Sequence, residues 1–226
     1  MPDAASGFQI IYADDSLLVL NKPAGLLSVP GRGADKQDCL SYRVQQRCPD
    51  ALVVHRLDMA TSGLMLMARE ADMQRLLSSL FEQREIHKRY IAVVDGHMQG
   101  DELTNVENES EDSWQLVDLP IAVDWPNRPL RIIDANHGKP SQTRWRVISF
   151  DENTQTTRVE LEPITGRSHQ LRVHLKALGH PILGDALYAP VQVLAKADRL
   201  LLHATALEFI HPASRQAMSF MSRPPF

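Results

Sequence analysis

A short apolar run at residues 64–68, Leu-Met-Leu-Met-Ala, constrains the fold of this chain most strongly. It directly follows Thr-Ser-Gly, and an apolar run of this length after a glycine is typical of a buried strand. The residues just before it include Arg56 and Asp58. Asp58 is therefore predicted at the edge of a rigid element, where a guanidinium can keep a carboxylate ionised in a partly dry site. Taken alone, Arg56 and Asp58 are more often a structural ion pair, so both interpretations stay open here.

The apolar pattern beyond this run predicts both helices and strands. Met73, Leu76, Leu77, Leu80 and Phe81 form one apolar stripe, which predicts a core-packed helix over residues 70–85. Further helices are predicted over residues 38–47 and 168–178, the latter capped by Ser168. Because strands dominate and helices do not alternate with them regularly, the sequence predicts an α+β fold. The other strands are predicted at residues 8–12, 17–20, 88–96, 145–150, 158–161 and 200–210.

Charge is distributed unevenly along the 226 residues. Residues 101–118 contain seven acids and no Lys or Arg; because the whole chain has a formal net charge of −4, the remainder carries +3. Residues 105–113 are expected to be a solvated loop. We therefore expect a single domain, 1–226, with packed halves at roughly 1–100 and 119–226 joined by this acidic loop. The segment after it is locally basic, which permits RNA binding; its basic residues are Arg128, Arg131, Lys139, Arg144 and Arg146.

Several classes of protein are disfavoured by the sequence. No apolar stretch is long enough to span a membrane, and residues 1–9 do not resemble a secretory signal. Cys39 and Cys48 are too few for a disulfide framework, so we expect a cytoplasmic protein. His169 and His174 are five residues apart and do not share a helix face, so no metal site is expected. Phosphate-binding, dinucleotide and nucleophile-elbow motifs are incomplete, which leaves carboxylate chemistry.

Four motifs follow one another in a fixed order along the chain. They are Asn21-Lys22-Pro23-x-Gly25-Leu26, His55-Arg56-Leu57-Asp58-x-x-Thr61-Ser62-Gly63, Lys88-x-Tyr90-x-Ala92-x-Val94-x-Gly96, and Thr165-Gly166-Arg167-x-His169-Gln170-x-Arg172-x-His174 with Gly179-x-Pro181-Ile182-x-Gly184-Asp185. With these motifs the chain resembles the large-subunit-type pseudouridine synthases over about residues 12–226. Asp124-Trp125-Pro126-Asn127-Arg128-Pro129 is similar to the subgroup with dual specificity for 23S ribosomal RNA and transfer RNA.

The resemblance implies a mixed, largely antiparallel sheet with a central catalytic cleft and flanking helices and loops. It implies Asp58 as the catalytic aspartate, Tyr90 as the active-site tyrosine and Arg167 as the arginine that pairs with the aspartate. The reaction conserves the atoms of the nucleotide, so no cofactor and no metal are expected. Asp58 would attack the sugar or the base, or remove the C2′ proton to give a glycal; the sequence leaves these routes open.

The expected partner is structured RNA, most specifically stem-loops of 23S ribosomal RNA and the transfer RNA anticodon arm. The target base must be extruded from its stack before reaction, and the resemblance implies that Arg56 fills the vacated space. We expect a monomer without a separate N-terminal RNA-binding module, and an acidic segment 101–112 that lies away from the RNA. The further RNA-binding residues expected are His55, Lys22, Arg128, His169, Gln170 and Arg172.

Two other functions stay open at this point. One is a catalytically silent RNA-binding factor on the same fold, which the joint presence of Asp58, Tyr90 and Arg167 argues against. The other is a carboxylate-dependent glycosidase-type hydrolase, which requires a second catalytic acid. The sequence offers no convincing second acid.

Overall fold

The computed structural model describes residues 7–99 and 114–226, so the acidic loop expected at 105–113 lies outside the described residues. Contacts divide the chain into two compact units. Unit 1 comprises the described residues up to 88 together with 203–226, and unit 2 comprises those from 89 to 202. This grouping differs from the expected halves because residues 203–204 return to pair with Ser62 and Gly63, just after Asp58.

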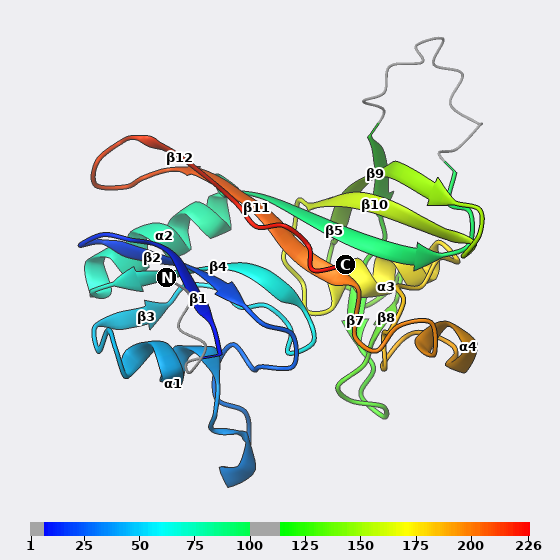
Figure 1. Cartoon of the computed structure of the whole chain (residues 1–226), viewed down its shortest axis with the longest axis horizontal. Helices are drawn as coiled ribbons and strands as arrows, with labels where there is room; N and C mark the ends of the chain where they lie inside the picture. Colours follow the sequence, from blue (N-terminus) through cyan, green and yellow to red (C-terminus); the bar gives the residue numbers. More distant parts are fainter. Residues whose placement is uncertain (1–6, 100–113) are drawn as a thin grey trace. The chain divides into compact units, whose positions relative to one another are not determined.

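Unit 1 is built on a sheet of strand order β1-β2-β4-β11, with β3 also paired to β4 and β12 to β11 (Figure 1). The β4–β11 pair is parallel, and the other pairs in this unit are antiparallel. The elements are β1 (Gln9–Ala13), β2 (Leu17–Lys22), the 3₁₀ turn η1 (Ala34–Lys36), α1 (Leu40–Gln45), β3 (Ala51–Val53), β4 (Ser62–Arg69), α2 (Ala71–Gln83), β11 (Leu202–Ile210) and β12 (Ala217–Met221).

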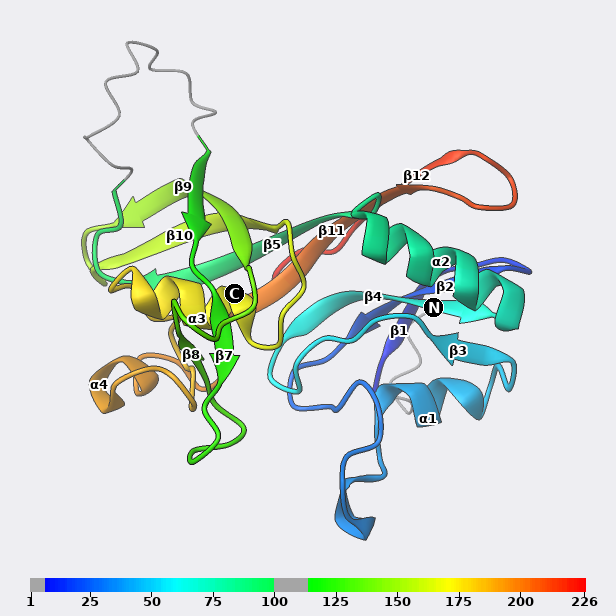
Figure 2. The same ribbon diagram turned by 180° about the vertical axis from the view of Figure 1, so that it is seen from behind.

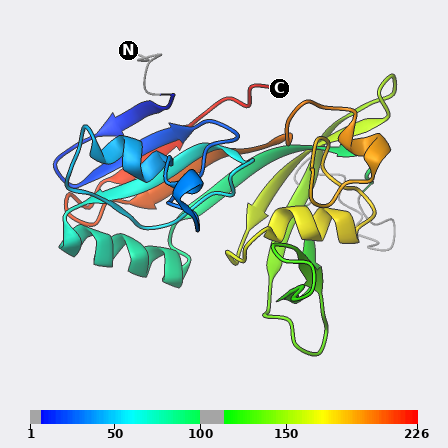
Figure 3. The same cartoon turned by 90° about the horizontal axis from the view of Figure 1, so that it is seen from below.

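Helix α2 covers one face of the unit 1 strands (Figure 3). Met73 and Leu77 are buried against apolar side chains of β2, β4 and β11, as the predicted stripe requires. Leu76 from the same stripe is 50% exposed and lies outside the core. The helix ends where Arg84 adopts a left-handed conformation and its N–H bonds the carbonyls of Leu80 and Phe81.

Unit 2 contains an antiparallel sheet of order β5-β10-β9-β6 and a separate β7–β8 hairpin (Figure 2). The predicted α+β class is therefore confirmed. No helix in residues 7–99 or 114–226 is both long and apolar enough to cross a membrane. The elements are β5 (His87–Asp95), β6 (Gln115–Asp118), β7 (Ile121–Val123), β8 (Arg131–Ile133), β9 (Gln142–Asp151), β10 (Thr156–Pro163), α3 (Gln170–Ala177) and α4 (Val191–Leu194).

Gly63 allows β11 to approach the start of β4 closely. Its φ is +112°, and a Cβ at this position would collide with the backbone of Ala204, lying 2.6 Å from its nitrogen. Beside it, the Ser62 hydroxyl bonds His203 Nδ1 at 2.8 Å, and His203 Nε2 bonds the Ser222 hydroxyl at 3.0 Å. These buried contacts join the strand after Asp58 to the segment 203–222.

We expect Gly63→Ala to lower the free energy of unfolding by at least about 3 kcal/mol, because both the φ angle and the contact with Ala204 oppose a Cβ. Gly25→Ala is the matched control, since Gly25 also has a positive φ but has open space around it. It should cost about 1–2 kcal/mol. Urea unfolding measures both, and equal losses would contradict the proposed close approach.

Candidate active site

The backbone on both sides of Asp58 is held by the loop that follows β2. Asp58 is half-buried, between β3 and β4. The Ser28 hydroxyl donates to the Leu57 carbonyl at 2.7 Å and accepts from the Leu57 N–H at 3.1 Å. The Gly25 N–H donates to the Met59 carbonyl at 2.8 Å. The carboxylate is thus presented from a loop that has little freedom to move.

Lys22 adds a buried ammonium group to this arrangement. The residue is fully buried, and its Nζ donates to the carbonyls of Pro23 at 2.8 Å, Leu26 at 2.7 Å and Met59 at 3.1 Å. These bonds use all three donors of the ammonium. The structure argues against the expected contact of Lys22 with RNA and assigns it to positioning the residue next to Asp58.

His55 also supports the Asp58 loop from the inside. Its Nε2 accepts a hydrogen bond from the Leu66 N–H of β4 at 2.8 Å, and its ring lies 4.4 Å from that of Phe81. Burial, reinforced by the charge of Lys88, lowers the pKa of His55 to about 3. The imidazole is therefore neutral at pH 7 and acts as a hydrogen-bond acceptor for the strand.

Arg56 and Arg128 are exposed, so both remain predicted RNA contacts. Arg56 directly follows His55, and Arg128 lies in the loop of the β7–β8 hairpin. The guanidinium carbon of Arg128 is 4.5 Å from the ring centroid of Trp125.

Tyr90 lies on β5 in unit 2, in register with Leu161 of β10, which is in turn opposite Trp145 of β9. Leu161 and Trp145 are buried and Tyr90 is half-buried. Opposed residues of neighbouring strands share a sheet face. Tyr90 is therefore held at the margin of a packed apolar row.

The opposite face of this sheet carries an aromatic and ionic cluster that the sequence did not predict. The guanidinium groups of Arg89, Arg144 and Arg146 lie 4.5, 5.1 and 4.9 Å from the ring of Trp114. Arg144 pairs with Glu162 at 3.0 Å, and Arg146 pairs with Glu160 at 2.7 Å. The positive charge expected after the acidic segment is thus partly neutralised by these two carboxylates.

Arg167 is exposed on a turn that Gln170 holds from within. The Gln170 side chain accepts from the Thr165 hydroxyl at 2.7 Å and from the Arg167 N–H at 3.0 Å, and it donates to the Gln142 carbonyl at 2.8 Å. Ser168 does not cap α3 as predicted; His169 precedes the helix with a φ of 60°. Gln170 is buried, so the structure argues against its expected direct contact with RNA.

Arg172 forms a buried bidentate ion pair with Asp185, at 2.8 and 2.6 Å. Its guanidinium also lies 5.0 Å from the ring of Tyr188, whose hydroxyl bonds His169 Nδ1 at 2.6 Å. Arg172 is only 4% exposed, so it supports the turn at 185–189 and does not present a free guanidinium to RNA. His169 is half-buried and stays a predicted RNA contact.

The three predicted catalytic residues belong to different units: Asp58 to unit 1, and Tyr90 and Arg167 to unit 2. Their joint action therefore stays a prediction. Ser28 and Tyr188 are positioning residues that the sequence analysis missed, because their bonds join segments far apart in the chain. Within the part of the chain that the structure describes, no group of three or more His, Cys, Asp or Glu side chains is arranged to hold a metal ion.

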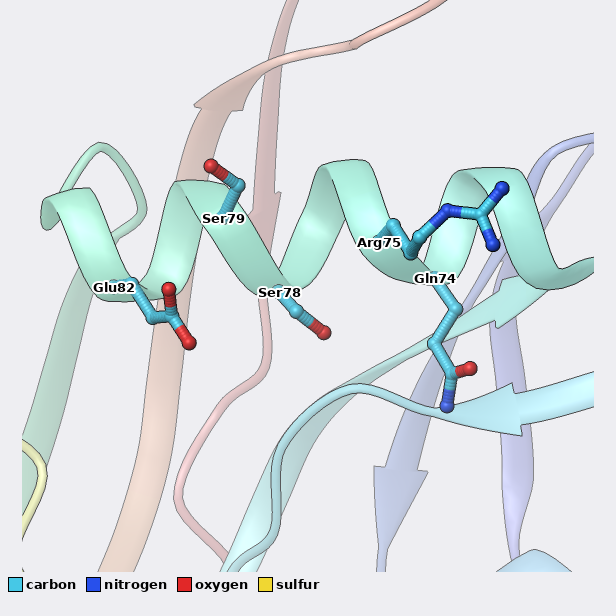
Figure 4. A pocket seen from close by; sticks show the side chains of 5 residues that line it. All are labelled: Gln74, Arg75, Ser78, Ser79 and Glu82. Carbon is cyan, nitrogen blue, oxygen red and sulfur yellow. The ribbon is translucent and has the colours of Figure 1, made fainter.

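A shallow pocket lies along α2, and none of the residues that line it is a predicted site residue (Figure 4). Gln74 points from the helix toward β3, where its amide donates to the Val53 carbonyl at 2.8 Å. The amide of Gln83 donates to the Ser79 hydroxyl. Polar groups of the pocket therefore form hydrogen bonds within the fold, and we assign the pocket no function. The residues that line it are Gln74, Arg75, Ser78, Ser79 and Glu82.

The chain is similar to known proteins of one family. Residues 16–177 match the model of the family described as RNA pseudouridylate synthase. The chain is 48% identical over 211 residues to the "Dual-specificity RNA pseudouridine synthase RluA" of Escherichia coli K12, covering 93% of this chain and 90% of that protein. The same protein of Vibrio cholerae is 49% identical over 205 residues, covering 91% and 78%. The solved structure of "Human RNA Pseudouridylate Synthase Domain Containing 1" is 27% identical with a TM-score of 0.77, covering 100% of this chain and 87% of that one.

We expect Lys22→Met to lower the free energy of unfolding by about 2–4 kcal/mol, because the carbonyl groups of Pro23, Leu26 and Met59 lose their donor. Amide hydrogen exchange should accelerate at Leu57 and Thr61, on either side of Asp58. Lys36→Met is the control, since Lys36 is exposed. Unchanged exchange in the Lys22 variant would contradict a positioning role.

The lowered pKa of His55 predicts a pH dependence of stability. Between about pH 6.5 and pH 3 the unfolded chain binds a proton at His55 that the folded chain excludes. The free energy of unfolding should therefore fall as the pH is lowered, by up to about 1.4 kcal/mol per pH unit from this group. His55→Gln should flatten urea-unfolding stability between about pH 6 and pH 4. As a control, His137→Gln at an exposed histidine should keep the wild-type dependence of the free energy of unfolding on pH. The same dependence in His55→Gln would contradict the lowered pKa of His55.

Proposed function

Because the chain belongs to the RNA pseudouridylate synthase family and isomerises uridine in RNA to pseudouridine, we propose that Asp58 is its catalytic carboxylate. The observation that supports this role is the fixed backbone of the Asp58 loop, bonded at Leu57 by Ser28 and at Met59 by Lys22 and Gly25. A catalytic group must be held within a narrow range of positions to act on a bound substrate. A structural ion pair alone requires no such support on both sides.

The reaction sets the requirements on these residues. The N1–C1′ bond breaks, the uracil turns, and C5 joins C1′, so the product contains the same atoms as the substrate. An ionised Asp58 serves either as the attacking group or as the base that removes the C2′ proton. The target nucleotide must first leave its stack, which costs a few kcal/mol and is cheapest in an unpaired loop. Exposed Arg56, two residues before Asp58, is suited to fill the vacated space.

The roles of Tyr90 and Arg167 rest on the motif match. We propose that Tyr90 stacks on the uracil and assists removal of the C5 proton, and that Arg167 supports the charged form of Asp58. Each is presented from a well-packed element: Tyr90 beside Leu161 on the sheet, and Arg167 on the turn that Gln170 bonds. The relatives found are RNA pseudouridine synthases, which does not favour the hydrolase alternative.

The substrates proposed are stem-loops of both ribosomal and transfer RNA. The support is the dual specificity that the names of the bacterial relatives state, together with the high identity over nearly the whole chain. We place the reaction in the cytoplasm, where both kinds of RNA are found, and propose a monomeric enzyme.

We expect Asp58→Asn to lower tritium release from C5-labelled uridine in RNA by at least about 100-fold, because the amide is neither a base nor a nucleophile at this position. Asp72→Asn is the matched control, since Asp72 is exposed and pairs with Arg75 on α2. Equal release by wild type and the Asp58 variant would refute the catalytic role. Release by neither protein, from any cellular RNA, would favour the silent RNA-binding factor.

Substrate choice is tested separately in cells that lack the gene. Pseudouridine should disappear from one or more sites in both ribosomal and transfer RNA, and it should return with the wild-type gene but not with Asp58→Asn. Loss from only one class of RNA would contradict dual specificity.

A further inference from the structure

The loop of the β7–β8 hairpin, residues 124–130, extends beyond the other elements of unit 2 in all three views (Figures 1, 2 and 3). Trp125 in this loop is 67% exposed, and no Phe, Tyr or other Trp in residues 7–99 and 114–226 is more exposed. Single exposed apolar side chains are common on protein surfaces, so the role of Trp125 is argued from its neighbours and from the shape of its loop.

Hydrogen bonds within the loop give it a defined shape. The Asp124 carboxylate accepts from the Asn127 side-chain amide at 3.0 Å. Backbone bonds run from Asn127 N–H to the Asp124 carbonyl and from Leu130 N–H to the Asn127 carbonyl, at 3.2 and 3.0 Å. The Arg131 guanidinium bonds the carbonyls of Pro129 and Leu130 at 3.1 Å each. A partner that binds an ordered loop does not have to bear the entropic cost of ordering it.

The chemistry of the loop fits one kind of partner. The guanidinium of Arg128 lies over one face of the Trp125 ring, 4.5 Å from its centroid, so this exposed loop presents an aromatic ring together with a positive charge. The neighbouring Asp124 and Asn127 are polar, and a single ring offers far less apolar area than a stable protein interface requires. A nucleobase followed by its phosphate matches both the ring and the charge.

The base of the loop is attached to the turn that carries Arg167. The Arg131 N–H donates to the Tyr188 hydroxyl at 2.9 Å, and the same hydroxyl bonds His169 Nδ1 at 2.6 Å. The Tyr188 ring is buried with Ile121 of β7 and Val173 of α3. One hydroxyl therefore connects the hairpin to the segment two residues beyond Arg167.

We propose that Trp125 is a stacking site for an unpaired nucleobase of the substrate RNA, and that Tyr188 is the residue that positions it. The inference rests on the proposed function for the nature of the partner. Trp125 would bind RNA without belonging to the proposed catalytic residues Asp58, Tyr90 and Arg167.

The test compares two synthetic RNA hairpins, one with an unpaired uridine-containing loop and one with the same loop made abasic. Trp125→Ala should weaken binding of the first hairpin by about 5- to 150-fold and leave binding of the abasic hairpin unchanged. The slope of log Kd against log salt should not change, because no phosphate contact is lost. Arg128→Gln should reduce that slope by about one for both hairpins.

Trp125→Phe keeps a ring and should show a smaller loss, which separates stacking from misfolding. Val191→Ala is the control for an exposed apolar residue elsewhere in unit 2, since Val191 is 80% exposed, and it should bind both hairpins as wild type does. Wild-type affinity of Trp125→Ala for the base-bearing hairpin, or an equal loss for the abasic one, would overturn the stacking site. Tritium release by wild type, measured in parallel, reports separately on the proposed function.

The role of Tyr188 is tested by a double-mutant cycle. Tyr188→Phe keeps the buried ring and removes the hydroxyl, so it should weaken binding of the base-bearing hairpin in the wild-type background. In the Trp125→Ala background its effect on that hairpin should be smaller, because the contribution through Trp125 is already lost and only that through His169 remains. Equal effects in both backgrounds would show that Tyr188 does not act through Trp125.

Discussion

The buried ammonium group of Lys22 determines the conformation of the loop on which the catalytic proposal depends. Removing a charge from water costs several kcal/mol unless nearby dipoles replace the lost hydration. Here three carbonyl oxygens, those of Pro23, Leu26 and Met59, provide that replacement. They can do so only when the loop after β2 and the loop containing Asp58 are both in place. The polypeptide thus satisfies the lysine and orders the residue beside the aspartate in the same step.

Buried polar side chains also fix a loop in unit 2, but here the residue beside them is exposed. Gln170 accepts a hydrogen bond from the Arg167 N–H, and Arg172 pairs with Asp185 in the interior. The Arg167 side chain itself lies at the surface. Buried polar groups must be fully bonded to be tolerated. Their positions are therefore set by the fold, and the motif around Arg167 is as much a folding element as a chemical one.

Much of the architecture could be predicted from the sequence, since long periodic segments are governed by local patterning. The helix predicted at 70–85 is α2 at Ala71–Gln83, and the run after Asp58 is β4. The family, the fold and the activity were predicted from ordered motifs and are confirmed by the comparisons. The short strands β3, β6, β7, β8 and β12 were not predicted, because a few residues carry too little periodicity. Polar residues usually lie at the surface, so RNA contacts were expected from three residues that the structure shows to be buried: Lys22, Gln170 and Arg172.

The pairing of β11 with the start of β4 also has a consequence for biosynthesis. The Ser62 hydroxyl bonds a histidine that is 141 residues further along the chain, and Gly63 lies against Ala204. A growing chain exposes the strand after Asp58 long before its partner has been made. Long-range pairings of this kind form slowly and late. The segment containing Asp58 therefore reaches its final support only after residues 203–222 have left the ribosome, so an unfinished chain emerging beside ribosomal RNA lacks that support.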